Sequence, residues 1–202
     1  MGMTIEPLAI EGSWLVTPQL HPDPRGLFFE SFKEEVFMQA TGQKLRLAQA
    51  NCSVSARGTV RGIHFADVPP GQAKYITCAV GKVLDVIVDI RVGSPTFGQY
   101  ESVTLDQDTR RALYLSEGLG HAFAALDDNS TVMYFCSEPY RPQAEHGVNP
   151  MDPNIGIDWG LISDELLLSE KDTAAPNLSE AAELGLLPTF ADCQAYRQQL
   201  KN

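Results

Sequence analysis

Apolar and polar residues alternate over much of the middle of the chain, with the period of two that β-strands produce. The clearest run is KVLDVIVDIR, residues 82–91, in which alternate positions would point to opposite faces of a sheet. Turn sequences such as VPPG, VGSPTFG and SEGLG separate it from similar runs. These runs are QANCSVS (49–55), AKYITCAV (73–80), YESVTL (100–105), RALYLS (111–116), HAFAAL (121–126) and TVMYFCSE (131–138).

Many short strands without helices between them indicate an antiparallel sandwich or barrel. Helical patterns flank this block. SFKEEVFMQATG (31–42) pairs Ser31 with Glu34 as a capping box and ends at Gly42, and NLSEAAELG (177–185) and FADCQAYRQQL (190–200) predict short helices near the C-terminus. The segment from Ser163 to Gly185 is acidic and rich in loop-forming residues. We therefore expect residues 1–202 to form a single mainly β domain with a helical C-terminal tail.

Composition narrows the possible partners. The 202 residues are 44% hydrophobic and 20% charged, which suits an ordinary globular protein, and the net charge of −11 argues against a nucleic-acid partner. We find no apolar run of membrane-spanning length and no signal peptide, and we expect a cytoplasmic protein without a membrane partner. The four cysteines are far apart in the sequence, which predicts reduced structural thiols.

Candidate chemistry begins in TVRGIHFADVPPGQAKY, residues 59–75, where His64 lies in a strand-like run between Arg61 and Lys74. A jelly roll of the cupin type encloses a pocket between two sheets, and most cupins bind a metal there through an H-x-H pair. Here the position two residues after His64 is Ala66, and SEGLGHAF offers only His121 as a second ligand. Two histidines without a third nitrogen make a poor metal site, so we expect neither a metal nor another cofactor.

A histidine in a pocket without a metal suits acid–base catalysis, because its pKa is near neutrality. Such a base needs a carboxylate to orient it, an acid to return the proton and a cation to stabilise an oxyanion. Asp172, Tyr134 and Lys74 are the candidates. Each also has an ordinary structural interpretation. Asp172 could be a solvated loop residue, Tyr134 a core residue beside Val132 and Cys136, and Lys74 a charge on an edge strand.

Several long stretches of the chain resemble the dTDP-4-dehydrorhamnose 3,5-epimerases and their relatives in antibiotic deoxysugar pathways. The resemblance extends from about residue 21 to residue 178. It is carried by DPRGLFFESF, QANCSVSARGTVRGIHF, PPGQAKYITCAVGKVLDVIVDIRVGSPTFGQYESVTL, LYLSEGLGHAF, MYFCSEPY, NPMDPNIGIDW and LLLSEKDTAAPNL.

The resemblance implies a metal-free homodimer with the cupin-type double-stranded β-helix, acting on a dTDP-4-keto-6-deoxyhexose. In such an enzyme a base removes the proton at C3 or C5, next to the C4 ketone, and a proton returns to the opposite face of the enolate. By resemblance His64 is the base, Asp172 its partner, Tyr134 the acid, and Lys74 the group that stabilises the enolate. The resemblance also implies a substrate-binding set of Arg25, Phe28, Glu30, Gln49, Asn51, Arg61, His121, Tyr140, Glu145 and Lys171.

Strict alternation along the strand would place Arg61 and His64 on opposite faces of the sheet. If both contact the substrate, the strand must twist or bulge between them, and Gly62 is the expected position.

The sequence also departs from the rhamnose-pathway pattern. Ser116 stands where the family usually has Pro, Ala122 where Gly is common, and EHGVNPMDP lacks a tryptophan often found before the DP. These features resemble the antibiotic-sugar relatives, some of which act at C3 only or C5 only, so the carbon that is inverted stays open. Two alternatives also stay open: a 3,4-ketoisomerase acting on the same substrates, and a non-catalytic nucleotide-sugar binding cupin.

Overall fold

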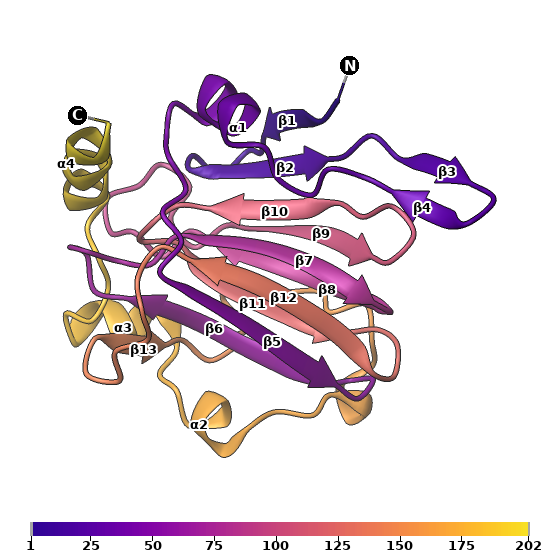
Figure 1. Cartoon of the computed structure of the whole chain (residues 1–202). Helices are drawn as coiled ribbons and strands as arrows, with labels where there is room; N and C mark the ends of the chain where they lie inside the picture. The colour runs from indigo at the N-terminus through magenta and orange to yellow at the C-terminus, as the bar shows by residue number, and fades with distance from the viewer. Residues whose placement is uncertain (1, 202) are drawn as a thin grey trace.

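The computed structural model describes residues 2–201, and most of its strands lie in two antiparallel sheets (Figure 1). The six-stranded sheet has the order β1 (Thr4–Pro7), β2 (Ser13–Thr17), β10 (Ala112–Leu115), β7 (Lys74–Val80), β12 (Ser130–Cys136) and β5 (Gln49–Ser55). The five-stranded sheet has the order β13 (Glu145–Gly147), β6 (Val60–Ala66), β11 (Gly120–Ala125), β8 (Lys82–Val88) and β9 (Tyr100–Asp106). Strands adjacent in each sheet are mostly distant in sequence, as in a jelly roll, so the predicted mainly β, cupin-type fold is confirmed.

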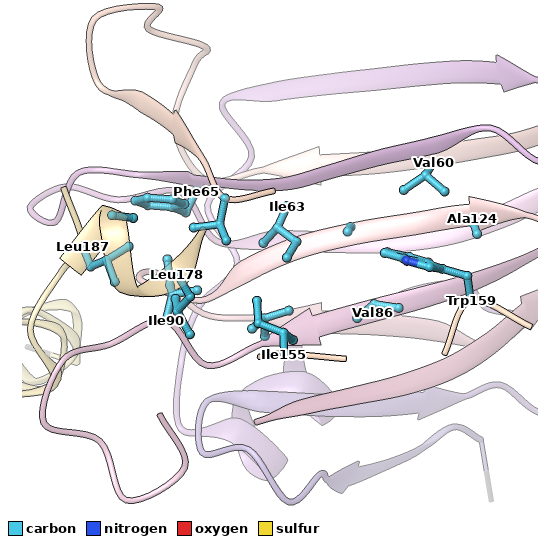
Figure 2. Close-up of a cluster of buried hydrophobic side chains, with 14 residues drawn as sticks. Val60, Ile63, Phe65, Val86, Ile90, Ala124, Ile155, Trp159, Leu178 and Leu187 are labelled. Atoms are coloured by element: carbon cyan, nitrogen blue, oxygen red, sulfur yellow. The ribbon is translucent and has the colours of Figure 1, made fainter. Parts of the chain in front are cut away.

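The alternation in β8 divides the apolar core into two layers. Val83 and Ile87 belong to the cluster between the two sheets, which also contains Ile76 and Leu113. The other face of β8 packs against the C-terminal part of the chain. Figure 2 shows this outer cluster, in which strand residues such as Val60, Ile63, Phe65 and Val86 lie with Trp159, Leu178 and Leu187. Both faces of the five-stranded sheet are therefore buried, which explains why β8 is apolar on both sides.

Helix α1 (Glu34–Thr41) packs on the outer face of the six-stranded sheet, where Phe37 contacts the ring of Tyr114. The predicted stop at Gly42 is confirmed, because Gly42 takes a left-handed conformation and its N–H donates to the carbonyl of Met38. The predicted capping box of Ser31 and Glu34 is wrong. The helix begins two residues later than expected, because its N-cap is Lys33 and not Ser31, and no side chain caps it.

The C-terminal third of the chain supplies short helices, as expected: α3 (Leu178–Glu183) and α4 (Phe190–Leu200). The 3₁₀ turn η1 (Ser163–Glu165) and the one-turn helix α2 (Glu170–Thr173) precede them in the segment predicted to be rich in loops. In Figure 1, α2 lies below β5 and β6, away from the other helices.

Strands β3 (His21–Asp23) and β4 (Gly26–Phe28) form a separate hairpin that projects beyond the two sheets (Figure 1). Its tip is exposed, and Phe28 leaves 67% of its surface open to solvent. All four cysteines are unpaired, and Cys78, Cys136 and Cys193 are buried. Among the described residues, no helix is long and apolar enough to cross a membrane.

Candidate active site

A pocket of about 460 Å³ opens between the two sheets and is closed on one side by the segment that includes α2. A second hollow of about 270 Å³ adjoins it, and the two share His64, Lys74 and Tyr134. The first is lined by Ser53, Thr59, Val60, Arg61, His64, Lys74, His121, Phe123, Tyr134, Leu167, Leu168, Ser169, Lys171 and Asp172. The second adds Gln49, Asn51, Gln72, Tyr140 and Glu145.

A β-bulge in β6 brings Arg61 and His64 to the same face of the sheet. Opposite β11, His64 pairs with His121 and Arg61 with Phe123, so three steps along β6 match two along β11. Gly62 has φ of +114°, and a Cβ at this position would collide with the carbonyl oxygen of His121. Only glycine fits such a conformation and approach, so the expected bulge at Gly62 is confirmed.

His64 forms a dyad with Asp172 across the edge of the five-stranded sheet. The imidazole Nε2 lies 2.7 Å from Asp172 Oδ1, and the His64 side chain is 35% exposed while that of Asp172 is 7% exposed. Burial alone would raise the pKa of Asp172, but hydrogen bonds from His64, Ser169 and the Gly62 N–H together hold that pKa below its ordinary value. The carboxylate is therefore ionised at neutral pH and can orient the ring and stabilise its protonated form.

Tyr134 and Lys74 belong to the opposite wall, because they lie on β12 and β7 of the six-stranded sheet. Tyr134 shares the inner face of β12 with Val132 and Cys136, as the alternation predicted, but its side chain also reaches the pocket. Burial raises the pKa of Tyr134, the nearby Cys136 adds to this, and Arg61 opposes it. The phenol therefore keeps its proton and can act as an acid.

Lys74 is buried beside Cys136, its cross-strand partner on β12. Burial lowers the pKa of Lys74, and the nearby negative charge of Glu145 opposes this change. An ammonium group placed in such a low-dielectric wall interacts strongly with any negative charge that develops in the pocket.

His121 has its own carboxylate partner, which the sequence did not identify as a site residue. Its Nε2 lies 2.9 Å from Oδ1 and 3.1 Å from Oδ2 of Asp85, which is fully buried on β8. A signal was present in the sequence, since Asp85 occupies a core-facing position between Val83 and Ile87. A carboxylate there requires a polar partner.

The structure brings most of the predicted binding residues to the pocket and its adjoining hollow. Gln49 donates from Nε2 to Asn51 Oδ1 over 2.8 Å and accepts from the Tyr140 N–H over 2.8 Å. Arg61 donates from Nε to Ser55 Oγ. Residues of the predicted set that line the two hollows are Gln49, Asn51, Arg61, His121, Tyr140, Glu145 and Lys171.

Three predicted binding residues, Arg25, Phe28 and Glu30, do not line either hollow of their own chain. Arg25 and Phe28 lie on the projecting hairpin, where the Arg25 side chain is 89% exposed and pairs with Asp23. Because these side chains are exposed and do not line the pocket of their own chain, they can contact another molecule.

Other pocket residues were not identified from the sequence, among them Ser53, Gln72 and Ser169. Small hydroxyl and amide residues in strands and turns carry no distinctive spacing, so only the fold reveals that they converge. Among residues 2–201, no group of three or more His, Cys, Asp or Glu side chains is arranged to hold a metal ion.

Comparison with known proteins gives a consistent result. The family model for dTDP-4-dehydrorhamnose 3,5-epimerase matches residues 7–180. A dTDP-4-dehydrorhamnose 3,5-epimerase of Mycolicibacterium smegmatis is 58% identical over 98% of both chains. A dTDP-4-dehydrorhamnose 3-epimerase of Streptomyces niveus is 55% identical over 96% of this chain and 92% of its own. Among solved structures, a 3'-monoepimerase of Streptomyces bikiniensis in complex with dTDP-quinovose superposes with a TM-score of 0.93, at 49% identity, over 97% of this chain and 98% of its own.

The jelly roll and the matches to known proteins together define a carbohydrate epimerase. More narrowly, the chain belongs to the dTDP-4-dehydrorhamnose 3,5-epimerase family, and the expected family is confirmed.

Proposed function

We propose that His64, Asp172, Tyr134 and Lys74 carry out the epimerisation of a dTDP-4-keto-6-deoxyhexose at C3, C5 or both. The family and its antibiotic-pathway members establish this type of reaction. The observation that supports the residue roles is the placement of His64 and Tyr134 on opposite sheets of the pocket. A sugar ring between them would present one face to the base and the other to the acid, as inversion at carbon requires.

The chemistry follows from the charges on the two walls. The C4 ketone acidifies the neighbouring C–H bonds, and His64, held by the ionised Asp172, removes one of these protons as a general base. The enolate oxygen gains negative charge, which the buried Lys74 ammonium stabilises without reorganisation of solvent. Tyr134 then gives its phenolic proton to the opposite face of the same carbon. His64 thus accepts the proton when one C–H bond breaks, and Tyr134 donates the proton that forms the new C–H bond.

The dTDP part of the substrate requires cations and a surface for the base. Arg61 and Lys171 line the larger hollow, and guanidinium and ammonium groups suit a diphosphate. Tyr140, half open to solvent beside Gln49 and Asn51, is placed to stack on thymine. No further cofactor enters this scheme.

We further infer that two copies of the chain form a homodimer in the cytoplasm. The hairpin of β3 and β4 exposes Arg25 and Phe28 far from the pocket of its own chain, so these two residues would serve the partner's pocket. The outer faces of β5 and β12 expose apolar side chains, including Val54 and Met133, of the kind that a subunit interface covers. The proposed unit in each copy is one domain of residues 1–202.

Solvent exchange tests the catalytic roles directly. The enzyme is incubated with dTDP-4-keto-6-deoxyglucose in D₂O, and NMR follows deuterium at C3 and C5. We expect deuterium at one or both carbons, and a fall of at least about a hundredfold for His64→Asn, since general-base catalysis contributes roughly 10²–10⁴-fold. Near-normal exchange by a folded His64→Asn protein would show that the base lies elsewhere.

The same spectra report which carbon is inverted. Deuterium at C3 alone would place the enzyme with the C3-specific relatives, and deuterium at both carbons with the 3,5-epimerases. Movement of the carbonyl carbon signal from C4 to C3 would instead identify a ketoisomerase. The absence of exchange in the unmodified protein would contradict the proposed function.

A further inference from the structure

The carboxylate of the proposed dyad does not come from the β-sheet scaffold. Asp172 lies on α2, within the segment from residue 163 to residue 173, which runs beside the start of β6 at the edge of the five-stranded sheet (Figure 1). The geometry of His64, in contrast, is fixed within a strand by pairing with β11 on one side and β13 on the other. The distance between the two members of the dyad therefore depends on how this segment is docked.

Backbone contacts near the start of β6 hold one end of the segment. The N–H of Leu167 donates to the Gly58 carbonyl over 2.8 Å, and the N–H of Val60 donates to the Leu167 carbonyl over 2.9 Å. Arg57 adds an ion pair with Glu165, with its Nη1 at 2.8 Å from Oε1. These contacts end at Leu167, five residues before Asp172.

Ser169 bridges the remaining distance. Its side-chain oxygen accepts a hydrogen bond from the Asp172 N–H over 3.1 Å, which caps the single turn of α2. The carbonyl of the same serine accepts from the N–H and the hydroxyl of Thr173, each over 3.0 Å. The Ser169 hydroxyl also helps to lower the pKa of the Asp172 carboxyl. One residue thus anchors the backbone of the turn that carries Asp172.

We propose that Ser169 is a positioning residue of the reaction: it holds Asp172 in hydrogen-bonding contact with His64 and acts through that dyad. This inference rests on the proposed roles of His64 and Asp172. The backbone N–H of the bulge residue Gly62 also helps to lower the pKa of the Asp172 carboxyl. The bulge that turns His64 into the pocket and the serine that anchors α2 therefore both act on the same carboxylate.

Because Ser169 also lines the pocket, a direct contact with substrate is the competing role. The two roles predict different kinetics. A positioning residue stabilises the transition state, so Ser169→Ala should lower kcat about tenfold, the equivalent of ~1.4 kcal/mol of activation free energy, and leave KM within about twofold. A binding contact would raise KM and leave kcat unchanged.

The experiment compares Ser169→Ala, Ser169→Thr and Ser163→Ala by steady-state epimerisation kinetics, with thermal unfolding measured for each. Thr keeps the hydroxyl and is an accepted N-cap, so Ser169→Thr should restore most of the lost kcat. Ser163 is an exposed serine at the start of the same segment, and its replacement should change neither kcat nor KM. Equal kcat losses in Ser169→Ala and Ser169→Thr, or no loss in Ser169→Ala, would overturn the proposal.

A double-mutant cycle with Asp172→Asn completes the test. If Ser169 acts through Asp172, adding Ser169→Ala to Asp172→Asn should cost no more than about twofold, whereas independent effects would multiply and would overturn the proposal. Failure of the proposed function itself has a different signature. In that case His64→Asn would keep solvent exchange, whatever the Ser169 variants do.

Discussion

Among single residues, Glu117 shows how the fold tolerates a charge outside the active site. It is 4% exposed and follows β10 by two residues, and a Cβ added to the neighbouring Gly71 would collide with its side chain. Its Oε2 atom has no hydrogen-bond partner among residues 2–201. Burial raises the pKa of Glu117, and this effect exceeds the opposing hydrogen bonds, including one from Ser137. Ionisation of this carboxyl therefore costs stability in the folded state.

We predict that Glu117→Gln raises the melting temperature at pH 7 and not at pH 4. Because the folded protein binds the Glu117 proton more tightly than the unfolded chain does, the associated stability is present below the ordinary carboxyl pKa and is lost as pH rises through the raised value. The neutral amide removes this loss. A gain of ~1 kcal/mol would raise the melting temperature by about 2–4 °C.

Calorimetry at several pH values between 4 and 8 would check this, with the exposed Glu183→Gln as the control that should show no pH-dependent gain. A Glu117→Gln curve parallel to that of the unmodified protein would mean that the carboxyl ionises without cost.

The active-site residues differ in how far the sequence could identify them. His64 could be proposed as a base from chemistry alone, because Ala66 breaks the metal-binding pattern around it. Asp172 was named as a candidate carboxylate from its chemistry, and the resemblance paired it with His64, but their contact depends on tertiary docking. Ser169 gave no signal, since a serine before an acidic turn is common in any sequence.

At the scale of elements, β6 shows how one glycine shapes a site. Val60, Ile63 and Phe65 all belong to the outer cluster, while Arg61 and His64 line the pocket, so the bulge at Gly62 shifts the alternation by one residue. Without the bulge, either Arg61 or His64 would turn away from the pocket.

We predict that Gly62→Ala lowers activity far more than the strain of an alanine at positive φ would by itself. A methyl group there would collide with His121 and Ala122 as well as meet an unfavourable φ of +114°. The β6–β11 pairing must shift, which would displace His64, and we expect a loss of ~2–4 kcal/mol in stability and over a hundredfold in kcat. Gly185→Ala is the matched control, because Gly185 also has positive φ, +68°, but has open space around it.

Solvent exchange and thermal unfolding of the two variants would separate the effects. Gly185→Ala should lose only the ~1 kcal/mol typical of a strained residue and keep full activity. An active, stable Gly62→Ala protein would show that the strand can accommodate a side chain at the bulge.

Elements with strict alternation were predicted closely, and those without it were missed. The strands β5, β7, β8 and β12 match their predicted runs to within three residues at each end. The hairpin of β3 and β4 was missed, because HPD and GLF are short and next to Pro24. The start of α1 was misplaced because the Ser31 carbonyl accepts a hydrogen bond from the Tyr75 hydroxyl, and Lys33, in an extended conformation, is the residue that precedes the helix.

At the scale of the whole molecule, an acidic chain with a net charge of −11 must bind a diphosphate. In the proposed site this conflict is resolved locally, because Arg61 and Lys171 line the pocket and can bind the diphosphate. The homodimer that we infer would add Arg25 from the partner chain. The proposal therefore couples assembly to substrate binding, and it can be tested by breaking the interface at a distance from the pocket.

Val54 is the residue for this test, because it is 60% exposed on the outer face of β5, close to Cys52 and Met133, which pair across β5 and β12. We predict that Val54→Lys converts the inferred dimer to a monomer at micromolar concentration, since two-fold symmetry would bury a lysine from each copy in the interface without a partner charge. Sedimentation velocity would measure the change, and KM should rise at least about tenfold as the partner's hairpin is lost, with stability nearly unchanged.

Leu184→Lys is the matched control, because Leu184 is 67% exposed after α3, on the part of the chain that covers the other sheet. It should remain dimeric and fully active. A monomeric Val54→Lys protein with unchanged KM would show that each pocket is complete within its own chain, and a dimeric Val54→Lys protein would place the subunit interface on a different face. If KM rises only in the monomer, the exposed Arg25 and Phe28 belong functionally to the neighbouring subunit, which would explain why the fold holds them so far from the pocket of their own chain.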